Sequence, residues 1–230
     1  MLTPKPKLSF NGLLASLLLL LILPGIVSPY SGEALGFLFM LVVFASLYLV
    51  ANDKQHLTIG LMLVVPVIIT HWSFGLIHEL VRVSVNAGIQ IVFLLYVCAQ
   101  IYDYLFRARV VESNVIYAAL CLYILLGVVW ALAYFLLELN LPGSIALKTE
   151  IDHSALNSRE LMAEIFYFSF VTITTLGYGD IAPVSLLARS LTIVQALVGQ
   201  VYIAIVIARL VSLQIAGEIN RSSGSDSKRD

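Results

Sequence analysis

The chain has 230 residues, of which 60% are hydrophobic and only 12% are charged, and its formal net charge is -1. Soluble chains are typically about 45–50% apolar and about 25% charged, so this composition argues against a soluble globular protein and predicts an outer surface covered by lipid. The nearly balanced charge gives no reason to expect a nucleic-acid partner. The two cysteines, Cys98 and Cys121, lie in apolar runs without the spaced ligands that a metal site needs.

Apolar runs define the predicted elements. A helix that crosses about 30 Å of hydrocarbon needs about 20 mostly apolar residues. Six runs approach this length, and in chain order they cover residues 11–28, 33–51, 57–77, 84–105, 115–138 and 185–214. The third contains Pro66, which is expected to kink its helix unless neighbours satisfy the carbonyl that it frees. A further run, 161–174, is too short to cross and predicts a re-entrant helix.

The basic residues predict the orientation of these spans. Most of them fall on one side of the predicted topology, and this bias marks the cytoplasmic side. Six crossings then place both termini in the cytoplasm. The first run, preceded by Lys5 and Lys7, also fits a secretory signal, whose removal would leave five spans. The Ser-rich, charged residues 218–230 are predicted to be a disordered cytoplasmic tail, too short for a regulatory domain.

A motif with specific chemistry follows the short run. Residues 172–180 read T-I-T-T-L-G-Y-G-D. This stretch resembles the selectivity-filter signature of the potassium channel family, commonly written T-V-G-Y-G-D, with Leu176 in place of the commoner Val. The resemblance implies a tetrameric pore in which each chain supplies one re-entrant pore helix and one filter loop.

The physical demands on such a filter can be stated for these residues. A potassium ion that enters a narrow pore loses its water, and rings of inward-pointing carbonyl oxygens can replace that water. Carbonyls of successive residues point the same way only if the backbone alternates in handedness, and Gly177 and Gly179 reach positive φ without steric cost. The expected potassium ligands, which form the predicted metal site, are the carbonyls of Thr175, Leu176, Gly177 and Tyr178 and the hydroxyl of Thr175.

Residues around the motif are assigned supporting roles. Asn157 or Ser158 is expected to cap the pore helix, whose C-terminal end carries a partial negative charge that favours a cation. The predicted filter supports are Thr174, Tyr167, Phe168 and Val171, with Phe170 completing an aromatic cuff. Relatives often carry two tryptophans where this chain has Tyr167 and Phe168, which predicts a less tightly braced filter in which Tyr167 remains able to reach Asp180.

Acidic residues surround the predicted outer entrance. Asp180 ends the filter at the outer mouth. Four more carboxylates precede the filter, and they either concentrate cations or are merely solvated: Glu138, Glu150, Asp152 and Glu160.

The last long run resembles the inner helix of bacterial six-span members of the family, chiefly over residues 198–202 and 208–210. Gly199 is the only glycine inside it, and it is predicted either to be a hinge for opening or to allow close helix packing. Gln195 and Gln200 are expected to face the cavity or a neighbouring helix, and Arg209 to lie at the cytoplasmic end.

The first four spans match voltage-gated relatives in number but not in charge. The fourth span has only Arg82 near its outer end, and the residues on its face, Asn86 and Gln90, are neutral. We therefore expect weak or absent voltage dependence. Three parts are predicted, namely a four-helix scaffold domain over residues 1–110, a pore domain over 111–217 and the tail.

The resemblance implies an all-α, multi-pass protein of the plasma (inner) membrane that conducts K⁺ passively. Its partners would be three further copies of itself, K⁺ and lipid, with no cofactor. The alternatives are a weakly selective cation channel, which would be expected to lose the Tyr178-Gly179 pair, and a non-conducting regulatory subunit. A potassium transporter would carry four degenerate loops in one chain, and an enzyme is disfavoured because no catalytic or phosphate-binding motif is found.

Overall fold

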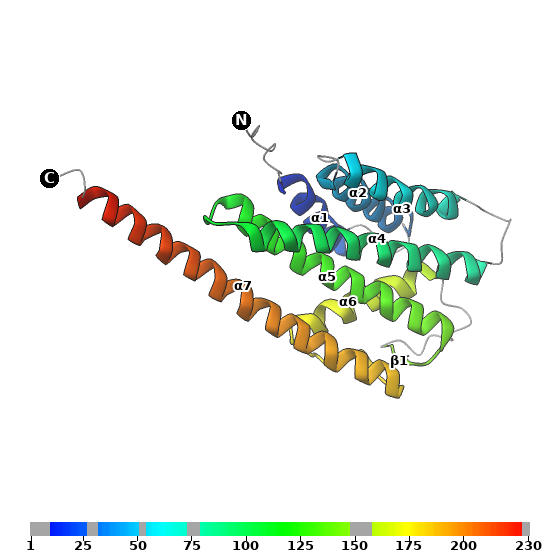
Figure 1. Ribbon diagram of the computed structural model, residues 1–230. Helices are drawn as coiled ribbons and strands as arrows, with labels where there is room; N and C mark the ends of the chain where they lie inside the picture. Colours follow the sequence, from blue (N-terminus) through cyan, green and yellow to red (C-terminus); the bar gives the residue numbers. More distant parts are fainter. Residues whose placement is uncertain (1–9, 27–31, 51–53, 73–78, 148–157, 227–230) are drawn as a thin grey trace.

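The computed structural model describes residues 10–26, 32–50, 54–72, 79–147 and 158–226, and nearly all of them are helical. The seven helices, labelled in Figure 1, are α1 Asn11–Ile26, α2 Gly32–Val50, α3 Lys54–Trp72, α4 Glu79–Arg107, α5 Ser113–Asn140, α6 Ser158–Ile173 and α7 Leu186–Asp226. Two short strands, β1 Ile145–Ala146 and β2 Ala182–Pro183, pair antiparallel.

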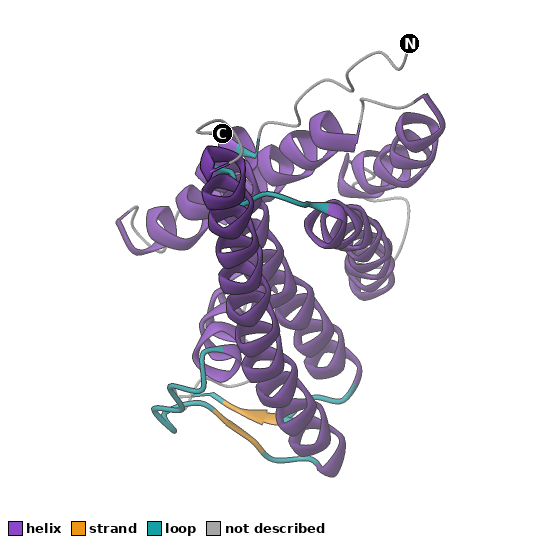
Figure 2. Ribbon diagram, turned by 60° about the vertical axis from the view of Figure 1, so that its left-hand side comes forward, coloured by secondary structure: helices purple, strands orange, loops and turns teal. Residues whose placement is uncertain are grey.

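Helix α5 lies at the centre of the arrangement. It contacts α4, α1, α6 and α7, while α2 and α3 pack on α1 and α4. Figure 1 shows α7 as a long helix along one side of the molecule, with α1 to α3 on the other side. Figure 2 shows the strand pair and the loop after α6 at the end of the molecule opposite the C-terminal end of α7.

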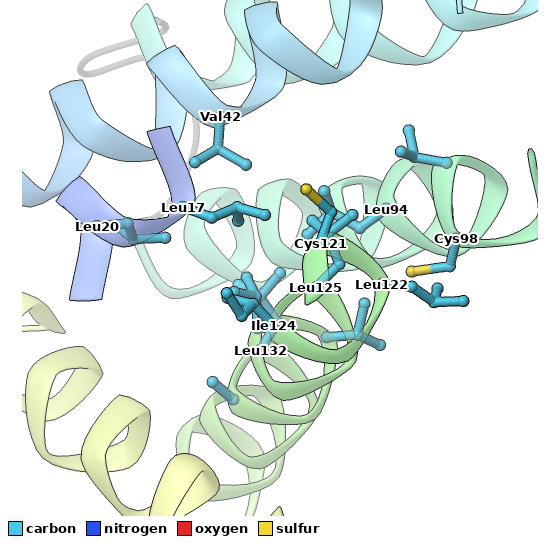
Figure 3. Packing of buried hydrophobic residues seen from close by; sticks show 14 of the residues in the cluster. Leu17, Leu20, Val42, Leu94, Cys98, Cys121, Leu122, Ile124, Leu125 and Leu132 are labelled. Carbon is cyan, nitrogen blue, oxygen red and sulfur yellow. The ribbon is translucent and has the colours of Figure 1, made fainter. Parts of the chain in front are cut away.

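A continuous apolar core explains this central position. Side chains of α1, α2 and α4 converge on α5 in Figure 3, among them Leu17, Val42 and Leu94 around Cys121 and Leu125. In the most apolar stretch of α5, 61% of the residues are buried, whereas the corresponding share is 22% in α4 and 17% in α7. The predicted boundary between scaffold and pore, at residue 110, lies in the α4–α5 connection, yet both parts contribute to this one core.

Helices occupy all six predicted spans, but they differ in length. Within the described residues, three are long and apolar enough to cross a membrane: Leu80–Arg107, Ser113–Asn140 and Leu186–Ile215. The apolar parts of the other three are shorter, Asn11–Leu23, Gly36–Leu49 and Gln55–Thr70. Even the full 16 residues of α1 extend only about 24 Å at 1.5 Å per residue. The structure thus supports a multi-pass helical protein, and crossing by α1, α2 and α3 remains a prediction.

Polar side chains of α4 support α3 near its proline. Asn86 Nδ2 donates to the Val67 carbonyl at 3.0 Å and to Thr70 Oγ1 at 2.7 Å, and Gln90 Nε2 donates to Asn86 Oδ1 at 2.6 Å. The helix continues through Pro66 to Trp72. These neutral residues of the fourth predicted span therefore serve helix packing, which fits their lack of charge.

The C-terminal helix is longer than its composition suggests. α7 continues to Asp226, through most of the range 218–230 for which we predicted disorder. Adding residues to an existing helix costs less free energy than nucleating one, so polar residues can extend a long apolar helix.

The turn after α5 uses a buried carboxylate. Glu138 is buried, and its two oxygens accept hydrogen bonds from the backbone N–H groups of Gly143 at 2.6 Å and Ile145 at 2.9 Å. The expectation of a solvated or cation-attracting Glu138 is therefore wrong, because this side chain stabilises the turn into β1. Of the other three loop carboxylates, Glu160 is exposed at the start of α6, and Glu150 and Asp152 lie outside the described residues.

Candidate functional site

The backbone of the loop after α6 alternates in handedness. Gly177 and Gly179 have φ angles of 57° and 78°, and the expected positive φ of both glycines is confirmed. Thr175 also has a positive φ, 60°, and among the described residues it is the only one other than glycine that does. A β-branched residue in this region is strained, and such strain persists where the surrounding contacts determine the conformation.

Hydrogen bonds to the end of α6 fix the direction of the loop peptides. The N–H groups of Leu176 and Gly177 both donate to the Val171 carbonyl, at 3.0 and 3.3 Å, and that of Thr175 donates to Thr172 at 2.9 Å. All peptides are trans, and in a planar trans peptide the N–H and C=O groups point in opposite directions. The carbonyl oxygens of residues 174, 175 and 176 therefore point away from the acceptors on α6.

The C-terminal end of α6 is fully hydrogen-bonded. The last four carbonyls of a helix have no partner inside it. In α6, N–H groups of the loop donate to three of these carbonyls, those of Phe170, Val171 and Thr172. The fourth, the carbonyl of Ile173, accepts the hydroxyl of Tyr123 on α5 at 3.0 Å. The loop and α5 together thus determine how this helix end is held.

The predicted supports lie on different sides of α6. The Tyr167 hydroxyl donates to Asp180 Oδ2 at 2.9 Å, at the end of the loop that leads to β2. Phe168 instead packs edge-on against Tyr134 of α5, with ring centroids 5.0 Å apart. Phe170 fits closely against Gly127 of α5, where an added Cβ would lie 2.7 Å from its ring. These two phenylalanines therefore pack α6 against α5, and within this chain only Tyr167 of the three aromatics reaches the loop's outer end.

Loss of the Tyr167 hydroxyl is expected to speed the decay of current. In Tyr167→Phe, Asp180 loses its donor, and the outer end of the loop can rearrange more easily. A half-exposed bond of this kind predicts a rise of about threefold in the decay rate during sustained opening. Patch recording of the reconstituted protein measures it, with Tyr48→Phe, an exposed tyrosine on α2, as the matched control. Equal decay rates in the two variants would contradict this role.

Side chains of the loop lie on the surface of the single chain. Leu176 is 55% and Tyr178 67% exposed. A hollow below them is lined by Ile173, Thr174 and Thr175 together with Gln200, Ile203 and Ala204 of α7. Gln200 thus faces this hollow. Of its two predicted positions, facing a cavity or facing a neighbouring helix, the first fits this arrangement.

Gln195 lies in a buried polar network between three helices. It is fully buried and accepts the Tyr134 hydroxyl of α5 at 2.8 Å. Its Nε2 donates to the carbonyl and hydroxyl oxygens of Ser169 on α6, at 3.0 and 2.9 Å. Ser169 Oγ in turn donates to the Gly127 carbonyl at 2.7 Å. The predicted contact of Gln195 with a neighbouring helix is found, and the network joins α5, α6 and α7.

Gly199 lies where α7 meets the end of α6. An added Cβ at this position would be 2.2 Å from the carbonyl oxygen of Ile173 and 3.0 Å from its Cγ1. The close-packing alternative therefore has a direct structural basis. α7 is a continuous helix through Gly199, and the hinge remains a prediction.

Arg209 joins α7 to the end of α4. Its Nη2 donates to the carbonyls of Phe106 at 2.6 Å and Ala108 at 3.1 Å, and its Nε donates to Leu105 at 3.4 Å. The guanidinium also lies 4.9 Å from the centre of the Phe106 ring. Arg209 therefore satisfies two carbonyls that the last turn of α4 leaves free and the Ala108 carbonyl just beyond the helix.

Several of these contacts escaped the sequence analysis. The sequence gives Tyr123, Tyr134 and Ser169 no assigned role, and it places Glu138 wrongly at the outer entrance, although a tyrosine or glutamate inside an apolar run indicates that a polar partner is needed. The partner of Tyr123 lies 50 residues away and that of Tyr134 lies 61 residues away, so no local pattern identifies them.

Comparisons with known proteins agree on the region that contains this loop. Residues 120–215 match the family model described as "Ion channel". Two-pore potassium channel 4 of Arabidopsis thaliana is 44% identical over 52 residues, which are 23% of this chain and 18% of that protein. Two-pore potassium channel 3 of the same plant is 33% identical over 79 residues, 34% of this chain and 18% of that protein.

The extent of these matches defines what they support. The chain spans less than a fifth of the length of either relative, and no solved structure matches it. The matched region contains α6, the loop and most of α5 and α7. Residues 120–215 are therefore similar to an ion channel domain, and the comparisons support the potassium channel family that the T-T-L-G-Y-G-D stretch resembles.

Proposed function

We propose that this chain is one subunit of a potassium-selective channel in which four copies surround one pore. K⁺ is the permeant ligand, held by the carbonyls of residues 175–178 and the Thr175 hydroxyl, and no cofactor takes part. Asp180 lies at the outer mouth. The protein is embedded in the plasma (inner) membrane, in contact with lipid, with both termini in the cytoplasm.

One observation carries this proposal, namely the backbone of residues 174–179. The N–H groups of residues 175–177 turn back to α6, so the carbonyl oxygens of residues 174–176 point to the opposite side, and the alternating positive φ angles continue to Gly179. Such a row can replace the hydration shell of K⁺ only when other copies complete a ring around it. The exposure of Leu176 and Tyr178 in the single chain is consistent with neighbours covering them in the assembly.

Reversal potentials test the proposal directly. The full chain, reconstituted in a planar bilayer, is expected to give a current whose reversal follows the K⁺ gradient, ignores the Na⁺ gradient and is blocked by barium. Native mass spectrometry is expected to give four copies. A monomer or dimer as the conducting species would contradict the proposal.

A pair of glycine variants provides the control. Gly179 and Gly143 both have positive φ, and an added Cβ at either meets no atom of the described residues within 4 Å. Alanine at either therefore imposes a similar backbone strain of about 1 kcal/mol. We expect Gly179→Ala to abolish selective current, because the loop backbone changes, and Gly143→Ala to keep it. Loss of selectivity in both would indicate general misfolding.

The alternatives give different outcomes in the same experiment. A reversal that follows Na⁺ as well as K⁺ identifies a weakly selective cation channel. A correctly assembled tetramer without current indicates a non-conducting regulatory subunit. The intact pair of Tyr178 and Gly179 favours the selective channel over both.

A further inference from the structure

The carbonyl of Ile173 has an unusual environment at the inner end of the candidate filter. It is the one carbonyl among the last four of α6 that no loop N–H group reaches. Its donor is the Tyr123 hydroxyl of α5, at 3.0 Å. This carbonyl belongs to the peptide that joins Ile173 to Thr174, the first residue whose carbonyl points away from α6. A rotation of this peptide therefore also changes the direction of the backbone at Thr174, where the loop begins.

The same carbonyl also lies close to α7. The backbone of Gly199 lies so close that an added Cβ would be 2.2 Å from the oxygen. The Ile173 carbonyl is therefore held between a hydroxyl from α5 and the bare backbone of α7. Ile173, Thr174 and Thr175 line the hollow below the loop, so this held peptide lies where an ion would enter from the inside.

A second tyrosine fixes the ring of Tyr123. Tyr202 of α7 stacks on it, with ring centroids 5.6 Å apart and an angle of 27° between the planes. The Tyr202 hydroxyl donates to the Ala119 carbonyl of α5 at 2.7 Å, one turn away from Tyr123. The two hydroxyls thus have the same chemistry and share one interface, but only that of Tyr123 touches the pore helix.

We infer that Tyr123 is a positioning residue for ion selectivity, whose hydroxyl sets the orientation of the Ile173–Thr174 peptide and thereby of the innermost filter carbonyls. This inference rests on the proposed function. Tyr123 does not touch the ion. It acts through the backbone, because without this hydrogen bond the Ile173 carbonyl has no donor among the described residues. The peptide is then held only on its other side, by the Thr174 N–H group that donates to the Phe170 carbonyl at 3.2 Å, and can tilt about that bond.

Two matched variants test the inference in the reconstituted full chain. Tyr123→Phe and Tyr202→Phe each remove one hydroxyl from the same stacked pair. We expect Tyr123→Phe to raise the Na⁺/K⁺ permeability ratio by about three- to tenfold, the effect of losing one net hydrogen bond. Tyr202→Phe is expected to leave the ratio unchanged. An unchanged ratio in Tyr123→Phe, or equal changes in both variants, would overturn the inference.

A spectroscopic measurement makes the test independent of assembly of the variant. An isotope-edited infrared band of the Ile173 carbonyl reports its hydrogen bond, because a bonded carbonyl absorbs at lower frequency than a free one. In the unmodified chain the band is expected at the bonded position, and a free-carbonyl band there would overturn the inference. If the unmodified chain itself fails to select K⁺, it is the proposed function that fails, which is a separate and distinguishable result.

Discussion

Alanine in place of Gly199 is expected to destabilise the packing of α7 on α6 and to suppress K⁺ current. The new Cβ would lie 2.2 Å from the Ile173 carbonyl oxygen, a backbone atom that cannot rotate away. One helix must therefore shift, and overpacking of this kind costs about 1–3 kcal/mol. Thermal unfolding in detergent measures the loss of stability, and flux into K⁺-loaded liposomes measures the loss of conduction.

The control for this variant lies on α4. An added Cβ at Gly88 meets nothing within 4 Å. Gly88→Ala is therefore expected to stabilise its helix by up to about 1 kcal/mol, since alanine has the higher helix propensity. Stability and opening, measured together in Gly199→Ala, also separate the two predicted roles of Gly199, a hinge and a close-packing residue. Unchanged stability with slower opening in Gly199→Ala would support the hinge and contradict the packing explanation.

Leucine in place of Gln195 is expected to weaken the joint between α5, α6 and α7. The substitution introduces an apolar side chain of similar size and leaves the buried Tyr134 hydroxyl without the acceptor that it has at 2.8 Å. It also removes both donations to Ser169. We expect the free energy of unfolding to fall by about 1–3 kcal/mol, measured by denaturant titration of the solubilised protein. Gln200→Leu, at an exposed position of the same helix, is expected to have little effect on stability.

A double-mutant cycle isolates the bond itself. Gln195→Leu and Tyr134→Phe are combined, and their joint effect is compared with the sum of the single effects. Hydrogen bonds between helices in membranes give coupling energies of about 0.6–1.7 kcal/mol. We expect a coupling in this range. Additive effects would show that the two residues do not act through a shared bond.

The sequence predicts the backbone of the loop after α6 better than the contacts that hold it. The glycine positions indicate where the backbone needs positive φ, because glycine alone adopts it without strain. Thr175 escapes this reasoning, since its conformation comes from hydrogen bonds to α6 and opposes its own preference. Pairing between Tyr167 and Asp180 was predictable because both residues flank one short loop.

Interhelical partners could not be predicted because they join residues far apart in the chain. Glu138 shows that nearby partners can be equally hard to predict. Its partners are only five and seven residues away, but its burial depends on the turn at Gly143, which composition does not reveal. The spans show a similar limit. Apolar composition marks all six ranges, yet α1 remains a helix of only 16 residues.

The bond between Arg209 and the end of α4 has a mechanical consequence. The carbonyls of residues 105, 106 and 108 accept hydrogen bonds from a cation carried by α7, at the end of the molecule remote from the loop after α6. If the C-terminal half of α7 moves away from the other helices, it must either break the three hydrogen bonds of Arg209 or move α4 with it. In the proposed channel, a force on the exposed face of α4 would therefore be transmitted to α7.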